Sequence, residues 1–359
     1  MTNMAQIPPR SVVIGVDTHL DQHTAAVKDE LGRNLGEAFF PTSSCGYKEL
    51  LAWARGFGEV AAFGIEETGS YGAGLSRFLS ASGALVIEVC RPSRQQRRRH
   101  GKSDPADARA AAAAVLSGEA AGLPKAGNST VEMIRMVRTA KTSAVRARTQ
   151  ALNVLRASIV TAPAGLREEL SGLSTARLIC RAAALRPGPI TDPISAAKHT
   201  IRSLAKRFQE LDVEISRHVA ILERLTAEVC PRLVQSFGIG ADSAAALLIA
   251  AGDNPERMGS EAAFAMLCGA SPVDASSGKQ LRHRLNRGGD RQANAALYRV
   301  VLVRLRWHGP TQDYVARRTA EGKTKREIMR CLKRFVAREA YNLMMASAGE
   351  QQSRLKAAA

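Results

Sequence analysis

A run of β-branched residues that ends in acids, SVVIGVDTHLD from Ser11 to Asp21, constrains the fold more than any other stretch of the sequence. Unbroken Val and Ile residues are typical of a strand that is buried on both faces. Gly15 allows another element to approach the backbone closely. A carboxylate at the end of a buried strand must be solvated, paired or bound to a cation, because burying it bare is very costly. Asp17 is therefore a candidate metal ligand, although an isolated Asp after a strand can also simply start a turn.

The residues that follow alternate between strand and helix patterns. The expected elements are strands at 24–28 and 35–40, a helix at 46–55, a strand at 60–65, a helix at 71–81 and a strand at 84–89. Three strands joined by tight turns make an antiparallel meander, and the rest alternates as in an α/β sheet. This is the order of a ribonuclease-H-like domain, in which the ends of the first and fourth strands lie side by side. Glu66, at the end of the fourth strand, is then expected beside Asp17.

Two further acids open an alanine-rich helix after the last of these strands. Ser103 is the expected N-cap, and Asp104 and Asp107 lie three residues apart, so they share one face near the positive end of the helix dipole. Converging carboxylates cannot all ionise without a cation, and a hard divalent ion with oxygen ligands is the natural one. Two such ions are a common device for displacement at phosphorus. The pattern predicts a site for hard divalent cations, with room for two ions, at Asp17, Glu66, Asp104 and Asp107.

The balance of charges points to a polyanionic partner. Lys and Arg number 51 against 33 Asp and Glu, which gives a net charge of +18. Nucleic acid is the simplest such partner, although a basic surface can also bind membranes. The densest basic run, RPSRQQRRRHGK at 91–102, is either a solvated loop or a contact to the phosphate backbone. In the second case the contacting side chains are Arg97, Arg98, Arg99 and Lys102.

Several features argue against a membrane or zinc protein. No apolar run is long enough to span a bilayer, and MTNMAQIPPR lacks the apolar core of a signal peptide, so we expect a cytoplasmic protein. The six cysteines are scattered without the spacing of a metal site, so they are expected to be reduced. His19 and His23 are four residues apart, but in strand and turn they would not share a face, which argues against zinc.

Long helices are expected from about residue 129. One seam of apolar residues is formed by Val145, Leu152, Leu155 and Ile159, and a second by Ile201, Leu204, Phe208, Leu211, Ile215, Leu222, Leu225 and Val229. His218 takes the one missing position of the second seam and is read as a polar residue that fixes register. The two helices predict an antiparallel coiled-coil hairpin, which could dimerise the protein or span a nucleic acid.

Beyond this hairpin, Gly238 and Gly240 flank a turn before an apolar helix, as in a helix-hairpin-helix unit whose N–H groups contact phosphate. Further on, Ser276 and Ser277 precede a glycine and a series of basic residues. These are Lys279, Arg282, Arg284, Arg287 and Arg291. A serine among guanidinium groups suits a phosphoryl-transfer nucleophile, and a Ser/Gly loop beside a basic helix fits the pattern equally well.

The C-terminal part, 314–348, is expected to form basic amphipathic helices, followed by a disordered tail at 349–359. The chain is thus predicted to combine an α/β region with an all-α region. The expected domains are an α/β domain at 1–125, a coiled-coil region at 126–230 and a helical domain with the serine motif at 231–348.

Five segments together resemble the DEDD-type insertion-sequence transposases (insertion sequence 110 family), which are related to Piv-type DNA invertases and bridge-RNA-guided recombinases. The segments are GVDTHLDQHTAAV, GIEETGSYGAGL, GKSDPADA, AGDNPERM with CGASPVDASSGKQLRHRLNRGGDRQANAAL, and RRTAEGKTKREIMRCLKRFVAREAY. The resemblance spans nearly the whole chain. Two positions depart from the family pattern: Leu20 stands where lysine is usual, and Arg109 where glutamate is frequent.

The resemblance implies a RuvC-like N-terminal domain whose four acids bind Mg²⁺, and a C-terminal domain whose serine forms a covalent link to DNA. The serine before the glycine matches the motif, so Ser277 is the expected nucleophile and Ser276 the alternative. It also implies a dimer or tetramer, and a structured noncoding bridge RNA that pairs with donor and target DNA. The expected function is thus a DNA transposase that works by transesterification.

Three alternatives remain open at this point. A junction-resolving nuclease would use the same acids to activate water, and an inactive nucleic-acid-binding scaffold would fit the charge. An actin-like ATPase shares the strand that ends in Asp, but the chain lacks a second Gly-rich phosphate loop and is too basic.

Overall fold

The chain divides into two compact units that are not contiguous in sequence. The computed structural model describes residues 11–90, 103–254, 257–278 and 283–358. The first unit comprises Met1–Val131 and Ala250–Met266, and the second comprises Glu132–Ile249 and Leu267–Ala359. A short segment from the C-terminal half of the chain therefore belongs to the first unit.

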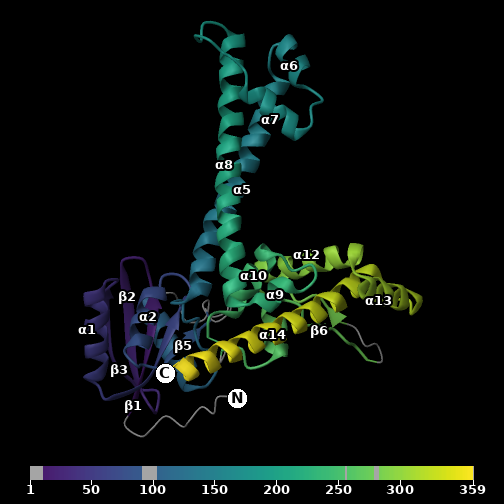
Figure 1. Ribbon diagram of the computed structural model, residues 1–359. Helices are drawn as coiled ribbons and strands as arrows, with labels where there is room; N and C mark the ends of the chain where they lie inside the picture. Colours follow the sequence, from purple (N-terminus) through teal and green to yellow (C-terminus); the bar gives the residue numbers. More distant parts are fainter. Residues whose placement is uncertain (1–10, 91–102, 255–256, 279–282, 359) are drawn as a thin grey trace. The chain divides into compact units, whose positions relative to one another are not determined.

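The first unit is built on a five-stranded mixed sheet with the order β3-β2-β1-β4-β5 (Figure 1). The strands are β1 (Ser11–Thr18), β2 (Gln22–Asp29), β3 (Asn34–Pro41), β4 (Glu59–Glu66) and β5 (Val86–Val89). The first three are antiparallel neighbours, whereas β4 pairs in parallel with both β1 and β5. This arrangement confirms the predicted meander and the central place of β1, all of whose residues are buried.

Helices cover both faces of this sheet. On one face, α1 (Ser44–Arg55) and α2 (Ala73–Ala81) place Leu50 and Leu75 against strand residues such as Phe63. On the other face, α4 (Asp104–Leu116) packs Ala112 on Val13 and its neighbours. The unit is a mixed α/β structure consistent with a RuvC-like fold.

The second unit begins with two long helices and two short ones between them. These are α5 (Thr130–Val160), α6 (Ala164–Leu170), α7 (Thr175–Ala183) and α8 (Pro193–Val229). In Figure 1, α5 and α8 run alongside each other, with α6 and α7 at one end of the pair. Leu155, Leu178 and Ile201 belong to their shared apolar core. The sequence predicted the long helices but not the short helices between them.

The predicted seam residues of these helices are buried to different degrees. The buried ones are Leu155, Ile159, Ile201, Ile215, Leu222 and Leu225. Val145 and Leu204 are half-buried, and His218 lies 3.5 Å from a carboxylate oxygen of Glu214 on its own helix. The coiled coil itself stays a prediction.

The rest of the second unit is helical apart from one small hairpin. Its helices are α9 (Pro231–Gln235), α10 (Ala241–Ala251), α12 (Arg291–Trp307), α13 (Gly309–Ala320) and α14 (Lys325–Ala358). The last residues of α10, and all of α11 (Glu261–Leu267) except Leu267, belong to the segment of the first unit. The hairpin pairs β6 (Val273–Asp274) with β7 (His283–Arg284), two short strands that were not predicted. The tail expected to be disordered from residue 349 is instead part of α14, which continues to Ala358 because no Pro or Gly follows Gly349 to end it.

The cysteines agree with the expectation that they are reduced. All six cysteines are free. Across the described residues, no helix combines the length and the apolar character that a membrane span requires.

Candidate functional site

Asp17 and Glu66 end two neighbouring parallel strands. Val16 pairs with Ile65 in the register of β1 and β4, so the next residue on each strand is an acid. Both acids are almost inaccessible, with 7% of Asp17 and 4% of Glu66 exposed. The Thr18 hydroxyl donates to the main-chain carbonyl of Glu66 over 3.1 Å, which ties the two strand ends together. The structure thus places these two acids side by side, as predicted.

Helix α4 lies on β1 and β4 because two glycines leave room for it. A Cβ atom at Gly15 would lie 2.0 Å from the carbonyl oxygen of Ala108, and one at Gly64 would lie 2.6 Å from a methyl group of Val115. The side of α4 that faces the sheet is formed by small side chains. They are Ala108, Ala111 and Ala112. The close approach expected at Gly15 is confirmed, and the element that approaches is α4.

The first turn of α4 carries Asp104 and Asp107. Asp104 is exposed and Asp107 half-buried. Ser103 is the N-cap residue with an extended backbone, as predicted, although its side chain makes no capping hydrogen bond. Pro105 in the first turn, which preorganises the backbone and has no N–H to satisfy, starts this helix without it.

Of the two departures from the family pattern, Arg109 lies in this helix and Leu20 follows β1. Arg109 forms an ion pair with Glu37 of β3, which attaches the first turns of α4 to the meander. The hydrogen bond from Arg109 holds the pKa of Glu37 below its usual value. Leu20 is 68% exposed just beyond β1.

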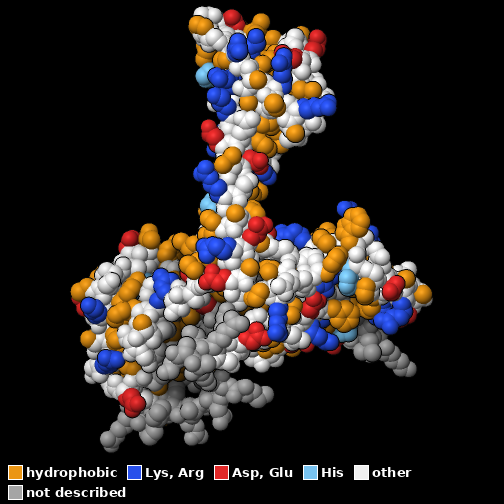
Figure 2. Space-filling model, viewed as in Figure 1, with side chains coloured by type: hydrophobic (Ala, Val, Ile, Leu, Met, Phe, Trp, Pro, Cys, Tyr) orange, Lys and Arg blue, Asp and Glu red, His pale blue; other side chains and the backbone are white. Residues whose placement is uncertain are grey.

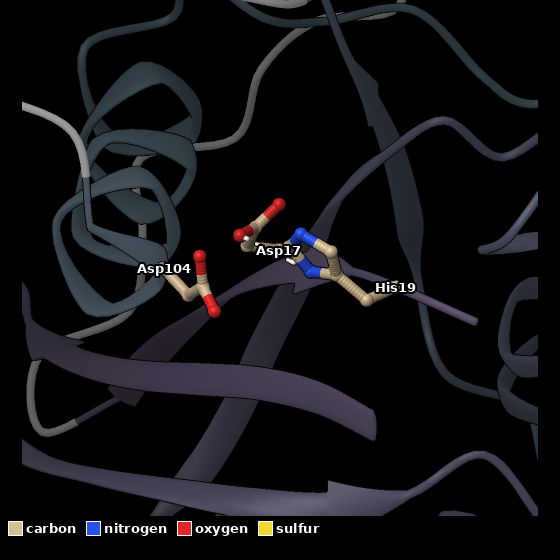
Figure 3. A group of neighbouring side chains, drawn as sticks. All are labelled: Asp17, His19 and Asp104. Atoms are coloured by element: carbon tan, nitrogen blue, oxygen red, sulfur yellow. Dashed lines mark ion pairs between the residues drawn. The ribbon is translucent and has the colours of Figure 1, made fainter. Parts of the chain in front are cut away.

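Asp17, His19 and Asp104 converge on one point (Figure 3). One potential ligand atom from each lies within 4.8 Å of the others. Figure 3 shows Asp104 reaching from α4 toward Asp17, with His19 on the opposite side. Nδ1 of His19 is 3.6 Å from Oδ2 of Asp17. Among the described residues this is the only group of three or more His, Cys, Asp or Glu side chains close enough to share an ion.

The electrostatics of Asp17 reflect its burial and its acidic neighbours. Burial is the largest cause that raises the pKa of Asp17 from 3.8 to about 6. The negative charges of Asp107 and Asp104 raise it further, and His19 opposes the shift. A divalent cation among these oxygens would remove the repulsion, and carboxylates are the ligands that Mg²⁺ and Mn²⁺ prefer. The donor set therefore fits a hard divalent ion.

His19 is the member of this group that sequence reasoning missed. Its spacing from His23 argues against a zinc pair, and no other expectation was attached to it. The useful signal was its position two residues after Asp17, because residues two apart in extended backbone point to the same side. His23 is fully buried and stacks on the ring of Tyr47, with ring centroids 5.8 Å apart.

Ser276 and Ser277 lie in the connection between β6 and β7, and both are exposed. The hydroxyl of Ser276 donates to Asp274, whereas Gly278 has a φ of +58°, a conformation that favours glycine. The side chain of Ser276 is thus engaged locally. Ser277 is the exposed hydroxyl next to the glycine of the motif.

The base of this hairpin is anchored by helices α12 and α14. Asn294 donates to the carbonyl oxygens of Cys268 and Gly269 over 2.8 and 3.1 Å. The ammonium group of Lys333 donates to the side-chain oxygen of Asn294 over 2.8 Å. The helical core therefore positions the segment that leads into the serines.

The predicted nucleic-acid contacts fall into two groups. Arg97, Arg98, Arg99, Lys102, Lys279 and Arg282 lie outside the described residues. Arg284, Arg287 and Arg291 are exposed on and after β7. Gly238, with a φ of +81°, and Gly240 form the turn that leads into α10, where the carbonyl of Gly240 accepts from Ser243 and Ala244. A helix-hairpin-helix role for that turn stays a prediction.

Comparison with known families adds the last observation. One family model, described as a transposase and specific for the DEDD type of the IS110 group, matches residues 14–162. A second, described as transposase of the IS116/IS110/IS902 family, matches residues 230–316. The comparison with curated proteins finds no match. The two matched ranges together cover more than half of the chain and include all four acids and both serines. The chain therefore belongs to the IS110 family of DEDD transposases, enzymes that act on the DNA of insertion sequences.

Proposed function

We propose that the protein is a site-specific DNA recombinase that cuts and rejoins strands through a covalent link to Ser277. Asp17, Glu66, Asp104 and Asp107 would hold Mg²⁺ beside the reacting phosphate. The observation that carries the proposal is the convergence of Asp17 and Asp104 from separate elements, with ligand atoms within 4.8 Å. Carboxylates this close together repel one another and lower the stability of the fold, whereas a bound cation relieves the repulsion.

The chemistry is an exchange of one phosphodiester for another. Oγ of Ser277 attacks the phosphorus and loses its proton, the P–O bond to the sugar breaks, and the sugar oxygen leaves as a hydroxyl. Arg284 and Arg287 would hold the non-bridging oxygens as negative charge develops. Bound Mg²⁺ would supply further charge stabilisation. The phosphoserine conserves the bond energy, so rejoining to a new sugar hydroxyl requires no ATP.

RNA guidance and oligomerisation belong to the same proposal. Its supports are the family resemblance and the net charge of +18, which suits more than one nucleic-acid partner. Figure 2 shows Lys and Arg side chains gathered around α6, α7 and the start of α8. Residues there include Arg167, Arg177, Arg181, Arg186, Lys198 and Arg202. This basic end of the second unit is a candidate surface for the bridge RNA or for DNA, in a dimer or tetramer.

A covalent adduct tests the nucleophile. Wild-type protein, Ser277→Ala and Ser276→Ala are incubated with labelled donor DNA, the copurifying RNA and Mg²⁺, and resolved on a denaturing gel. We expect an adduct with the wild type and with Ser276→Ala, and none with Ser277→Ala. The two serines are adjacent in sequence and both are exposed, so each variant is a matched control for the other.

The other outcomes identify the alternatives. An adduct that is lost only in Ser276→Ala would transfer the role to Ser276. Cleaved DNA without any adduct would identify a nuclease that activates water. DNA that stays intact, with no difference on mutation of Asp17 or Asp104, would identify a binding scaffold.

The RNA proposal has its own measurement. RNA that copurifies with the full chain is sequenced, and we expect one structured species whose removal by ribonuclease ends site selection but not general DNA binding. A heterogeneous mixture of cellular RNA would contradict guidance.

A further inference from the structure

The segment Ala250–Met266, which belongs to the first unit, makes hydrogen bonds to the backbone that follows α4. The carboxylate of Asp253 accepts the N–H groups of Gly127 and Asn128 over 3.1 and 3.2 Å. The side chain of Asn254 accepts from the N–H of Ala126 and donates to the carbonyl of Pro124, over 3.3 and 3.0 Å. Polar side chains that satisfy consecutive backbone groups hold that backbone in one conformation.

Arg257 connects the same segment to the sheet. Its guanidinium donates to the carbonyl oxygens of Leu123 and Ala251 over 3.1 and 3.2 Å. It also lies 3.6 Å from a carboxylate oxygen of Glu88 on β5, and only 13% of its side chain is exposed. Glu88 in turn accepts a hydrogen bond from the Thr68 hydroxyl over 2.8 Å. Arg257, Glu88 and Thr68 form one continuous chain of polar contacts within the first unit, which we call the Arg257 chain.

The Arg257 chain ends at the turn that follows Glu66. Thr68 is buried, with 8% exposed, and is two residues beyond Glu66. Between them, Glu67 has a φ of +51°, and no other described residue except glycine has a positive φ. Such a conformation is strained and persists only where the surroundings hold it. The turn that presents a candidate metal ligand therefore depends on its supports.

Two supports reach this turn from the α2 side and from β1. A Cβ atom at Gly72 would lie 2.8 Å from the carbonyl oxygen of Glu66, so α2 begins directly against it. Thr18 donates to the same carbonyl. The Arg257 chain, which originates in the C-terminal half of the sequence, supplies a further support.

We propose that Arg257 is a positioning residue for the acid cluster, and that through Glu88 and Thr68 it fixes the turn that presents Glu66. A segment from the C-terminal half of the chain thereby completes the metal site of the N-terminal domain. The inference rests on the proposed metal function of the acids. It gives the link between the two halves of the sequence a chemical role beyond stability, because groups that orient ligands tune metal affinity.

Thr68→Val tests the chain with little change of shape, since valine replaces the hydroxyl by a methyl group. The matched control is Thr226→Val in the second unit, where a fully buried Thr donates only to carbonyls of its own helix. Mn²⁺ is titrated into each full-length protein and binding is measured by calorimetry. We expect Thr68→Val to weaken Mn²⁺ affinity by about 10-fold or more, and Thr226→Val to leave it unchanged.

Arg257→Ala completes a double-mutant cycle. If Arg257 acts through Thr68, the double variant binds Mn²⁺ no more weakly than the weaker single variant. If the affinity losses of the two single variants multiply in the double variant, Arg257 and Thr68 affect Mn²⁺ binding independently. That result would overturn the positioning role. Arg257→Lys keeps the charge but loses the planar set of donors, so we expect it to rescue affinity only in part.

The failures can be told apart. A wild-type protein that binds no Mn²⁺ refutes the metal site and this inference with it. Wild-type binding that is unchanged in both Thr68→Val and Arg257→Ala refutes this inference alone. Loss of thermal stability without loss of Mn²⁺ affinity assigns Arg257 a purely structural role and also overturns it.

Discussion

The ionised side chain of Asp17 destabilises the fold, and a bound metal ion would offset this cost. Its pKa is raised to about 6, with burial as the largest cause. The folded protein therefore holds a proton that the unfolded chain has already released, and stability falls as the pH rises from 3.8 to about 6. Above that window the ionised group costs the fold roughly 3 kcal/mol, since a tenfold change in proton affinity corresponds to about 1.4 kcal/mol.

Asp17→Asn should therefore be more stable than the wild type at pH 8 without divalent metal, by up to about 3 kcal/mol. At pH 4 the gain should vanish, because Asp17 is then protonated in the fold. Mg²⁺ should stabilise the wild type and not the variant. Urea unfolding at both pH values, with EDTA or Mg²⁺, checks each point. A variant that is less stable than the wild type in EDTA at pH 8 would contradict the cost assigned to Asp17.

His23 affects stability in the opposite pH direction. Burial is the main cause, and the charge of His19 the second, that lowers its pKa from 6.5 to about 4. Below pH 6.5 the His23 side chain is protonated in the unfolded chain but still neutral in the folded protein. Stability is therefore lost as the pH falls from 6.5 to about 4. His23→Phe should flatten this part of the stability curve by up to about 3 kcal/mol. An unchanged slope in urea unfolding between pH 7 and pH 4 would show that His23 is not responsible.

At the scale of the elements, the contact between α4 and the sheet controls where the acids lie. The backbone of α4 approaches Gly15 so closely that a Cβ atom would meet the Ala108 carbonyl at 2.0 Å. Backbone atoms cannot rotate away, so an added methyl group must displace the helix. The displacement would also move Asp104 and Asp107 relative to Asp17.

Gly15→Ala should therefore lower the free energy of unfolding by at least about 2 kcal/mol and weaken Mn²⁺ binding. Gly122→Ala is the matched control, because a Cβ atom there meets nothing within 4 Å and its φ is not positive. Denaturant unfolding and metal titration of both variants provide the measurement. Equal stability of the two variants would mean that α4 does not lie as closely on β1 as described.

At the scale of the whole molecule, the excess of positive charge should dominate binding. Each phosphate contact releases counterions, so DNA affinity should fall by several orders of magnitude as salt rises from about 50 to about 200 mM. Arg177→Gln and Arg186→Gln, at the basic end of the second unit, should each reduce the salt slope by about 1 if that surface contacts the nucleic acid.

Arg55→Gln, at the exposed end of α1, is the charge-matched control for this experiment. Fluorescence anisotropy with labelled DNA or RNA at a series of salt concentrations gives the slopes. If Arg177→Gln, Arg186→Gln and Arg55→Gln all behave alike, the basic end of the second unit is not the contact surface.

Much of the α/β unit was predictable because its signals are local. The apolar run of β1, the turns of the meander and the alternation that follows set the order of the strands. That order already brings Asp17 and Glu66 to adjacent strand ends, as the parallel register confirms. The long helices were equally visible, since their apolar periodicity extends over many turns.

The sequence by itself therefore determined which acids could meet and which serine stands beside the glycine. Only the tertiary structure decided that His19 joins Asp17 and Asp104, that Ser277 lies on a short hairpin, and that Arg257 reaches back to Glu88. These relations join residues far apart in sequence or depend on how an irregular backbone turns. The periodicity of the sequence does not predict long-range contacts or irregular turns, because both depend on packing that forms only when the whole domain folds.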